Sequence, residues 1–234
     1  MNDVFGSYAA PVSPPPLADW DEAPWPQREY SAPLGTAVGG RLTIAPGGSR
    51  ITIAGNPRST DLWRAHFSGE VPQIDLHPDG VTLRYRRHSL ISWVNELIGD
   101  EETAAMMELA GQIPWRIEFG GGVSRCSAYL ADVRLEALRI AGGASQVDVS
   151  LSRPVGVVPI QIGGGASQVT VCRPRDVAVR LRIAGGASQL DFDGHHAGSV
   201  GGELRWQTPG ADGAADRYEI DVAGGASMFT LTAR

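Results

Sequence analysis

The chain has 234 residues, of which 42% are hydrophobic, and carries a formal net charge of −6 at pH 7. A chain of this length and apolar content can form a folded domain with a sizeable core. Its acidic balance argues against broad electrostatic attraction to nucleic acid or to an anionic membrane. The chain contains arginine but no lysine. A phosphate-binding P-loop, which needs a lysine, is therefore excluded.

Residues 1–35 are predicted to form a disordered tail. The segment is rich in proline and has no helical or strand-like hydrophobic period, so it cannot bury enough apolar surface to offset the entropy of ordering. Three aromatic residues, Trp20, Trp25 and Tyr30, lie in this segment. They could anchor the tail in the groove of a partner protein, or they could pack back on the folded body.

Residues 36–88 are predicted to form irregular N-terminal rungs, a rung being one layer of a stacked β-structure. Apolar and polar residues alternate in "RLTI" and again in "RITI", which are separated by a Pro-Gly-Gly turn. This alternation is typical of strands with one buried face. Two further strand-like runs, 73–77 and 81–86, flank the turn sequence "HPDG", whose proline and glycine suit a tight reversal.

Residues 89–113 are predicted to form a short helical insert. In "DEETAAMMELAG", Asp100 suits an N-cap, two glutamates follow in the first turn, and Gly111 ends a run of good helix formers. The preceding "SLISWVNELIG" could form a second short helix with an apolar face. An amphipathic membrane anchor is the alternative, but the acidic flank and the lack of a basic polar face favour packing on the β-structure.

A Gly-Gly-Ala-Ser corner recurs, with variations, through residues 114–234. Its serine returns at intervals of 21 or 22 residues, with one interval of 39 before the last, at Ser124, Ser145, Ser167, Ser188 and Ser227. A period of this size predicts a repeat architecture. Apolar and polar residues alternate before and after the corners, as in "WRIEF" and "VTV". Each repeat is therefore predicted to be a strand, a corner and a second strand.

Two arrangements fit this repeat. In a β-solenoid, each repeat is one rung, like strands stack in parallel, and the glycines form a column where a Cβ would clash or φ must be positive. In an antiparallel sandwich, each repeat is a hairpin and the corners alternate sides. The joint recurrence of the glycine pair, the alanine and the serine favours the solenoid, in which the serines could form a hydroxyl ladder and are not nucleophiles. The predicted structural corner comprises Gly142, Gly143, Ser145, Gly164, Gly165, Ser167, Gly185, Gly186, Ser188, Gly224, Gly225 and Ser227.

The longest interval, before the final corner, contains "DGHHAGSVGGELRW". "GGELRW" is predicted to be a worn corner and strand followed by a loop. The strand after the final corner is predicted to expose an unpaired edge unless another segment covers it. His195 and His196 lie close to Asp191 and Asp193, but adjacent histidines on an extended chain point in opposite directions. A surface turn is therefore favoured over a metal site.

No catalytic residue, metal site or cofactor is predicted, since the sequence contains neither "GxSxG" nor "HExxH". Cys126 and Cys172 form no metal-like pair and are predicted to be reduced thiols, at least one of them facing the core. A locally basic stripe is a candidate partner-binding face, and it comprises Arg139, Arg173, Arg175, Arg180 and Arg182. The alternative for these residues is a solvated face of mixed charge.

The "GGAS" corner, flanked by strands and followed by the returns "SRP" and "RPRD", resembles the toast-rack type of bacterial adhesin-like β-solenoid domain. The repeat is more loosely similar to bactofilin filaments. The resemblance spans about residues 115–234 and implies a scaffold or interaction module without a cofactor. We recognise no signal peptide or membrane-spanning run and so expect a cytoplasmic bacterial protein, unlike the secreted and membrane-linked members.

Three functions are consistent with these patterns. The first is a non-enzymatic scaffold whose β-solenoid binds protein partners, with the tail as a tether. The second is self-assembly, as a filament or end-to-end oligomer, through an exposed final rung. The third is a carbohydrate- or small-ligand-binding module around Trp206, Arg205 and the two histidines. The first is favoured because the rungs are regular and no catalytic signature is present. Neither nucleic acid nor a membrane is expected as a partner.

Overall fold

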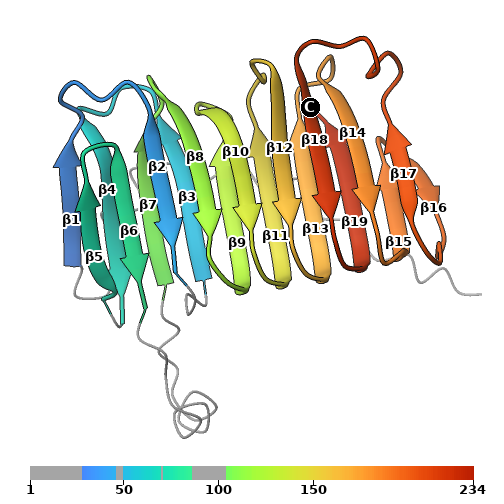
Figure 1. The fold of residues 1–234 in the computed structure, drawn as a ribbon, viewed down its shortest axis with the longest axis horizontal. Helices are drawn as coiled ribbons and strands as arrows, with labels where there is room; N and C mark the ends of the chain where they lie inside the picture. Colours follow the sequence, from blue (N-terminus) through green and yellow to red (C-terminus); the bar gives the residue numbers. More distant parts are fainter. Residues whose placement is uncertain (1–27, 46–49, 70, 86–103) are drawn as a thin grey trace, which may run out of the picture.

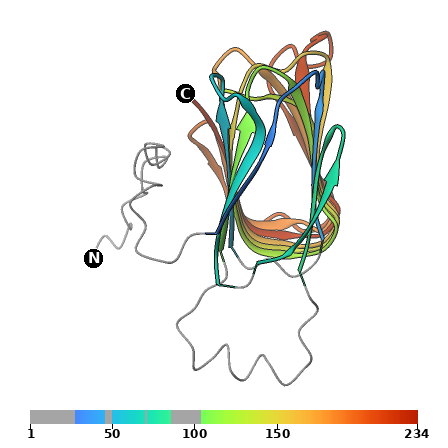
Figure 2. The ribbon, with the colours of Figure 1, turned by 90° about the vertical axis from the view of Figure 1, so that its left-hand side faces the viewer.

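The computed structural model describes residues 28–45, 50–69, 71–85 and 104–234. All regular secondary structure in these residues is β-strand, arranged as two mixed sheets of ten and nine strands. The sheets face each other as two long walls (Figures 1 and 2), and their inward side chains form one apolar core. Over the described residues the chain is therefore all-β, as the predicted strands and corners led us to expect.

The ten-stranded sheet has the spatial order β1 (Arg28–Pro33), β4 (Asp61–Ser68), β7 (Ala104–Ala110), β3 (Arg50–Asn56), β9 (Val123–Leu130), β11 (Ala144–Leu151), β13 (Ala166–Arg173), β19 (Ala226–Ala233), β15 (Ala187–Phe192) and β16 (His195–Ala197). The nine-stranded sheet has the order β17 (Leu204–Gln207), β14 (Ala178–Ile183), β18 (Arg217–Val222), β12 (Val157–Ile162), β10 (Arg134–Ile140), β8 (Pro114–Phe119), β2 (Gly40–Ile44), β6 (Gly80–Arg84) and β5 (Gln73–His77). Interior strands pair in parallel, and antiparallel pairs lie towards the ends.

Each repeat crosses from the nine-stranded to the ten-stranded sheet at its glycine corner, as β10 does on its way to β11. Neighbouring repeats pair in parallel, and the last inward residues before the corners lie in one row. Ile140 pairs with Ile162, Ile162 pairs with Val222, and Val222 pairs with Ile183. This parallel alignment does not fit an antiparallel sandwich of hairpins.

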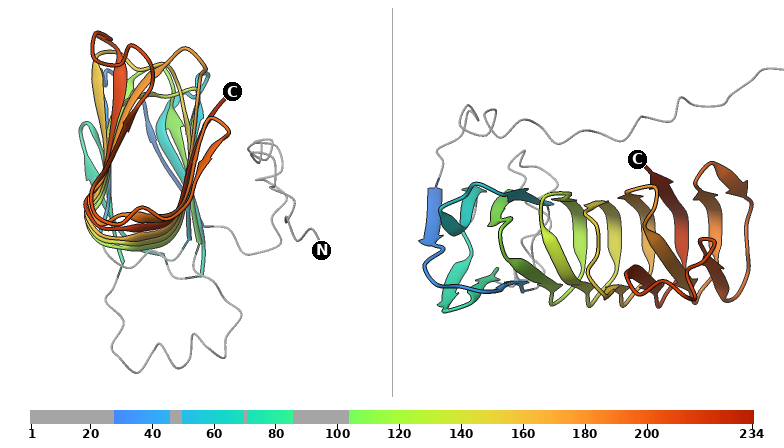
Figure 3. Two further views of the ribbon diagram at one scale, coloured as in Figure 1. Left: turned by 90° about the vertical axis from the view of Figure 1, so that its right-hand side faces the viewer. Right: turned by 90° about the horizontal axis from the view of Figure 1, so that it is seen from above.

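The corners follow one another along one long side of the molecule (Figure 3) and hydrogen-bond through their main chains. The Gly142 N–H donates to the Gly121 carbonyl at 3.2 Å, and the Gly164 N–H donates to the Gly142 carbonyl at 3.1 Å. Gly224 donates to Gly164 at 3.2 Å, and Gly185 donates to Gly224 at 3.0 Å. These bonds satisfy main-chain groups at bends that would otherwise leave them unpaired.

The spatial order of the repeats departs from chain order near one end. The last repeat, β18–β19, lies between β12–β13 and β14–β15, so its red strands stand among orange ones in Figure 1. Strand β19 pairs with β13 on one side and β15 on the other. The edge that the final strand was expected to expose, unless another segment covered it, is therefore covered on both sides. Among the described strands, the sheets end at β1 and β16 and at β5 and β17.

Residues 104–110, which fall in the predicted helical insert 89–113, form strand β7. The helix prediction is wrong here because Ala105, Met107 and Leu109 alternate into the core, with exposures of 1%, 0% and 0%. Strand β7 also has main-chain partners on both sides, in β3 and β4. Burial and sheet pairing thus override the helix propensity of this segment. The preceding residues of the predicted insert, 89–103, lie outside the described residues.

Residues 28–33, within the predicted disordered tail 1–35, form strand β1 and pair with β4. The tail prediction is therefore wrong for this part. The Tyr30 ring packs edge-on against Phe67, with ring centroids 5.9 Å apart, so Tyr30 packs back on the folded body. Trp20 and Trp25, the other two aromatic residues considered as anchors, lie outside the described residues.

Both cysteines are buried free thiols. Cys126 is 0% exposed in the core, which confirms a core-facing thiol. Burial, with a smaller contribution from Asp148, raises its pKa to about 12.

We expect iodoacetamide at about pH 8 to alkylate Cys126 in the folded protein about a thousandfold more slowly than an exposed cysteine, because so little thiolate forms. Mass spectrometry of the labelled peptide, before and after unfolding, measures this; rapid labelling of folded protein would contradict it.

Candidate partner-binding groove

A shallow groove of about 650 Å³ lies on the outer face of the nine-stranded sheet, towards β17. Strand alternation turns every second side chain of β14, β17 and β18 away from the core, and loop 208–216 joins β17 to β18 beside the groove. The polar lining residues are Gln161, Arg180, Arg182, Arg205, Gln207, Asp212, Glu219 and Asp221. Charges of both signs therefore meet on one open surface.

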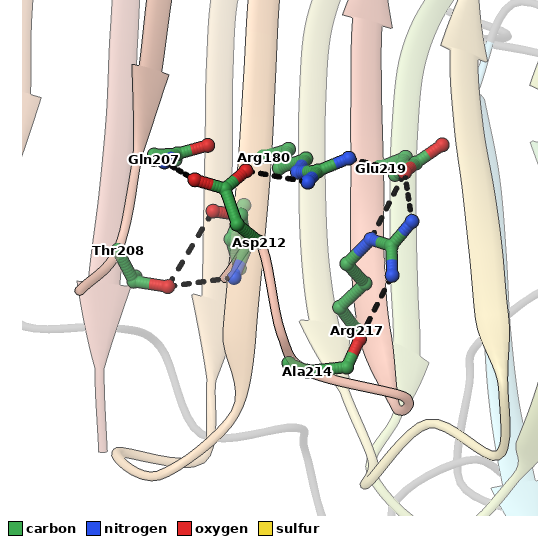
Figure 4. Close-up of polar contacts among 8 residues, drawn as sticks. Arg180, Gln207, Thr208, Asp212, Ala214, Arg217 and Glu219 are labelled. Atoms are coloured by element: carbon green, nitrogen blue, oxygen red, sulfur yellow. Dashed lines mark hydrogen bonds and ion pairs between the residues drawn. The ribbon is translucent and has the colours of Figure 1, made fainter. Parts of the chain in front are cut away.

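Asp212 connects the loop to the sheet (Figure 4). Its Oδ1 accepts a hydrogen bond from Arg180 Nη2 at 2.6 Å, and its Oδ2 accepts one from the Gln207 side-chain amide at 2.9 Å. The Arg180 Nη1 atom also lies 3.6 Å from Glu219 Oε1. The hydrogen bond from Gln207, followed by that from Arg180, lowers the pKa of Asp212 below its ordinary value. Asp212 is thus held as a carboxylate over β14.

Two further contacts anchor the loop near its ends. Thr208 Oγ1 accepts a hydrogen bond from the Val179 N–H at 2.9 Å, and Arg217 Nη1 donates to the Ala214 carbonyl at 2.8 Å (Figure 4). Arg217 also forms an ion pair with Glu219, in which Nη2 and Oε1 are 2.7 Å apart. Polar contacts from both β14 and β18 therefore hold the loop in place.

A second cluster of charges lies closer to the glycine corners. Arg182 Nη1 is 3.1 Å from Asp221 Oδ1, and Arg182 Nε is 3.4 Å from Glu203 Oε1. Glu203 also pairs with Arg205. The hydrogen bonds from Arg205 and Arg182 lower the pKa of Glu203, while the bond to Glu203 and the charge of Asp221 raise the pKa of Arg182. Glu203 and Arg182 are therefore both charged near neutral pH.

Acid should weaken the ion pairs that Asp212 and Glu203 form on this surface. Because pairing lowers the folded-state pKa of Asp212 and Glu203, their stabilising effect is complete above the range near pH 4 in which unfolded carboxyls protonate. It is lost as the pH falls through the folded values. We expect the difference in melting temperature between wild type and Asp212→Asn to be constant from about pH 7 to 5 and to shrink below about pH 4. Scanning calorimetry at each pH measures it, and a difference that does not change with pH would contradict the pairing.

The structure brings together only two of the five arginines predicted to form a basic stripe. Arg180 and Arg182 are alternate residues of β14. Arg139 lies on β10, separated from β14 by β12 and β18, and pairs with a glutamate of β8 at 3.7 Å. Arg175 is exposed in the turn after β13, whereas Arg173 is only 2% exposed. The basic stripe is therefore wrong as a single face, because Arg173 points inward and carboxylates pair with Arg139, Arg180 and Arg182.

The acidic half of the groove was not predicted from the sequence. Asp212 is 32 residues from Arg180 in the chain, and Asp221 is 39 residues from Arg182. Only the insertion of β18 beside β14 brings these residues together. The available signal was the alternation in "RYEID", which places Glu219 and Asp221 at outward positions like those of the two arginines.

The two histidines lie on β16, at the end of the ten-stranded sheet. His196 Nδ1 is 3.4 Å from Asp191 Oδ2. Across the described residues, no group of three or more His, Cys, Asp or Glu side chains is arranged to hold a metal ion. The Trp206 ring, on β17 of the other sheet, stacks on Phe192 with ring centroids 4.7 Å apart and packs against the core. Trp206 therefore contributes to the core at this end of the sheets.

The predicted corner residues lie where the two sheets meet. The serines after the glycines are exposed, and within the described part of the chain their hydroxyls do not hydrogen-bond to one another, so the main-chain bonds connect the corners. A Cβ on the first glycine of four corners would lie 2.5–2.7 Å from a main-chain nitrogen of the next corner, at Gly142, Gly164, Gly185 and Gly224. Gly186 differs because its φ is +79°, a conformation that favours glycine.

Within the described residues, no helix is both long and apolar enough to cross a membrane.

Neither the family models nor the curated proteins compared with the sequence gave a match. Among solved structures, the chain is similar to a "putative cell adhesion protein" from Clostridium sporogenes, with a TM-score of 0.69 and 16% identity, over 89% of this chain and 99% of that one. A "putative adhesin" from Bacteroides fragilis aligns over 88% of this chain and 95% of that one, at 6% identity and a TM-score of 0.28. The likeness to the clostridial protein shows that this chain has an adhesin-like fold.

Proposed function

We propose that the chain is a non-enzymatic interaction module, a β-solenoid scaffold that binds a protein partner through the groove of the nine-stranded sheet. The fold shared with the clostridial protein supports a binding role. The parallel register and the hydrogen bonds between corners support the solenoid interpretation. A stack of this kind is rigid and therefore fixes the positions of outward side chains.

The exposed ion pairs of the groove carry this proposal. The side chains of Arg182 and Asp221 are 42% and 45% exposed although they pair with each other. Such pairs add little net stability, because water solvates the separated charges nearly as well. A partner that presents its own carboxylates and guanidinium groups can therefore replace these pairs at small cost. The fixed pattern of both charges then selects a partner with the complementary pattern.

The described edges do not favour the alternative of end-to-end filaments. Strand β16 has three residues and β17 has four. Strand β1 ends at Pro33 with an irregular register, and β5 lies between Pro72 and Pro78. Short or proline-bearing edge strands hinder the addition of a further strand.

A comparative pull-down tests the proposal. The bait variants are Arg180→Ala/Arg182→Ala in the groove and, as a matched control on the opposite sheet, Gln168→Ala/Gln189→Ala. We expect partners retained by wild type and control to be reduced several-fold on the groove variant, and more salt to weaken their binding. Circular dichroism confirms that all baits are folded. Binding that is equal for the two variants, or a wild-type bait that retains nothing, would contradict the proposal.

A further inference from the structure

The β18–β19 repeat fills a slot whose two sides have the same register. Val157 of β12 and Ala178 of β14 both pair with Arg217, and Ile162 and Ile183 both pair with Val222. On the other sheet, β13 and β15 likewise pair with β19 through equivalent alanines. The two flanking repeats are consecutive in the chain, and the last repeat separates them.

Most contacts of β18–β19 are made with the strands that flank it on either side of the slot. Its inward side chains are buried between the flanking strands, with exposures of 0–2%, at Tyr218, Ile220, Val222, Phe229 and Leu231. These contacts, and the main-chain pairing on both sides, do not depend on which copy of the chain supplies the repeat. Which copy supplies the repeat matters instead for the contacts of loop 208–216. Examples are the contact of Asp212 with Arg180 and that of Asp216 Oδ1 with the Gly156 N–H at 2.6 Å.

We propose that this slot also accepts the β18–β19 repeat of a second copy of the chain, so that two copies exchange the repeat and form a dimer. Exchange of an identical element between copies needs no new interface. Within one chain the repeat competes at an effective concentration of about 1 mM, typical of a short flexible linker. Exchange should therefore become substantial only when folding takes place near that concentration. Because loop 208–216 would then run between copies, exchange would also rearrange the groove.

Chains that each carry one introduced cysteine, besides the buried native Cys126 and Cys172, report the exchange. Gln168 of β13 pairs with Met228 of β19, and Met228 pairs with Gln189 of β15. In the test mixture, one chain carries Gln168→Cys and the other Met228→Cys; in the control mixture, the second chain carries Gln189→Cys. Cysteines on neighbouring strands are close enough to form a disulfide, whereas cysteines on two strands with a third strand between them are not. Each mixture is unfolded, refolded at about 1 mM or about 0.01 mM, oxidised and separated by non-reducing electrophoresis.

We expect a cross-linked heterodimer in the test mixture at the higher concentration, at least about tenfold less at the lower one, and only background in the control mixture. One chain that carries both Gln168→Cys and Met228→Cys should cross-link within itself, which establishes refolding and geometry. If that internal bond forms but the test mixture stays at the control level, the exchange is refuted. Failure of the internal bond would show that β19 does not lie beside β13 and would overturn the proposal as well. Neither result depends on partner binding by the groove.

Discussion

Gly164→Ala is expected to lower the free energy of unfolding by about 3 kcal/mol, the effect of forcing extra volume into a closely packed region. The new Cβ would lie 2.7 Å from the nitrogen and 2.9 Å from the Cα of Gly143. These are main-chain atoms of the neighbouring corner, to which Gly164 is hydrogen-bonded, and they cannot move aside as a flexible side chain can. Denaturant unfolding followed by tryptophan fluorescence measures the loss.

Gly165→Ala is the matched control in the same corner. The atom nearest to its new Cβ is the Gly225 carbonyl oxygen at 3.4 Å, an ordinary contact, and neither glycine has a positive φ. We expect its stability to lie within about 0.5 kcal/mol of wild type, because reduced freedom of the unfolded chain offsets a small strain. Equal destabilisation by the two substitutions would contradict the contact between corners.

Asp193→Asn is expected to lower the free energy of unfolding by about 3 kcal/mol, because it leaves a buried charge without its partner. The Arg173 side chain is 2% exposed, and its Nη2 atom donates to Asp193 Oδ2 at 2.5 Å. The remaining acceptors of Arg173 are the main-chain carbonyls of Pro174 and Arg175. Asp193 has a φ of 52° in the turn before β16, a conformation that asparagine also tolerates. The substitution thus removes the charge and keeps the turn; unfolding in denaturant measures its effect.

A second substitution separates the charge from other causes. Replacing both members of a buried ion pair is often nearly neutral, whereas removing one is not. We therefore expect Arg173→Met/Asp193→Asn to be more stable than Asp193→Asn alone. A double variant that is less stable than the single one would show that Arg173 contributes through packing, and the charge argument would fail.

The register of the repeats could be predicted because it depends on local pattern. Alternation fixes which side chains face inward, and the glycine corner fixes where each strand ends, so Ile140, Ile162, Ile183 and Val222 could be aligned without a structure. The glycines themselves are required because the main chains of adjacent corners approach too closely for a Cβ. Both features are encoded within one repeat.

The order of the repeats could not be predicted, because the local pattern is the same in several of them. Since β12, β14 and β18 share one alternation and one corner, each would fit beside either of the others. Strands β16 and β17 reverse direction and pair antiparallel to β15 and β14. They occupy the outer sides of these strands, and β18 and β19 occupy the other sides. The only sequence signal was the interval of 39 residues before Ser227. The groove was missed as a consequence, because its acidic residues reach Arg180 and Arg182 only through this insertion.

The helix prediction failed at β7 because local propensity and tertiary burial disagree. Ala105, Met107 and Leu109 are good helix formers, yet they are also alternate residues. With β3 on one side and β4 on the other, the strand buries all three and satisfies the main chain. A window of seven residues fits both periods, so only the neighbouring strands decide between them.

The order of the corners can be measured directly by nuclear magnetic resonance, through scalar couplings across hydrogen bonds. Couplings are expected from the Gly224 nitrogen to the Gly164 carbonyl carbon and from the Gly185 nitrogen to the Gly224 carbonyl carbon. A coupling from the Gly185 nitrogen to the Gly164 carbonyl would show instead that the repeats stack in chain order. If couplings within the sheets were resolved but none joined one corner to another, the corners would not be stacked at all.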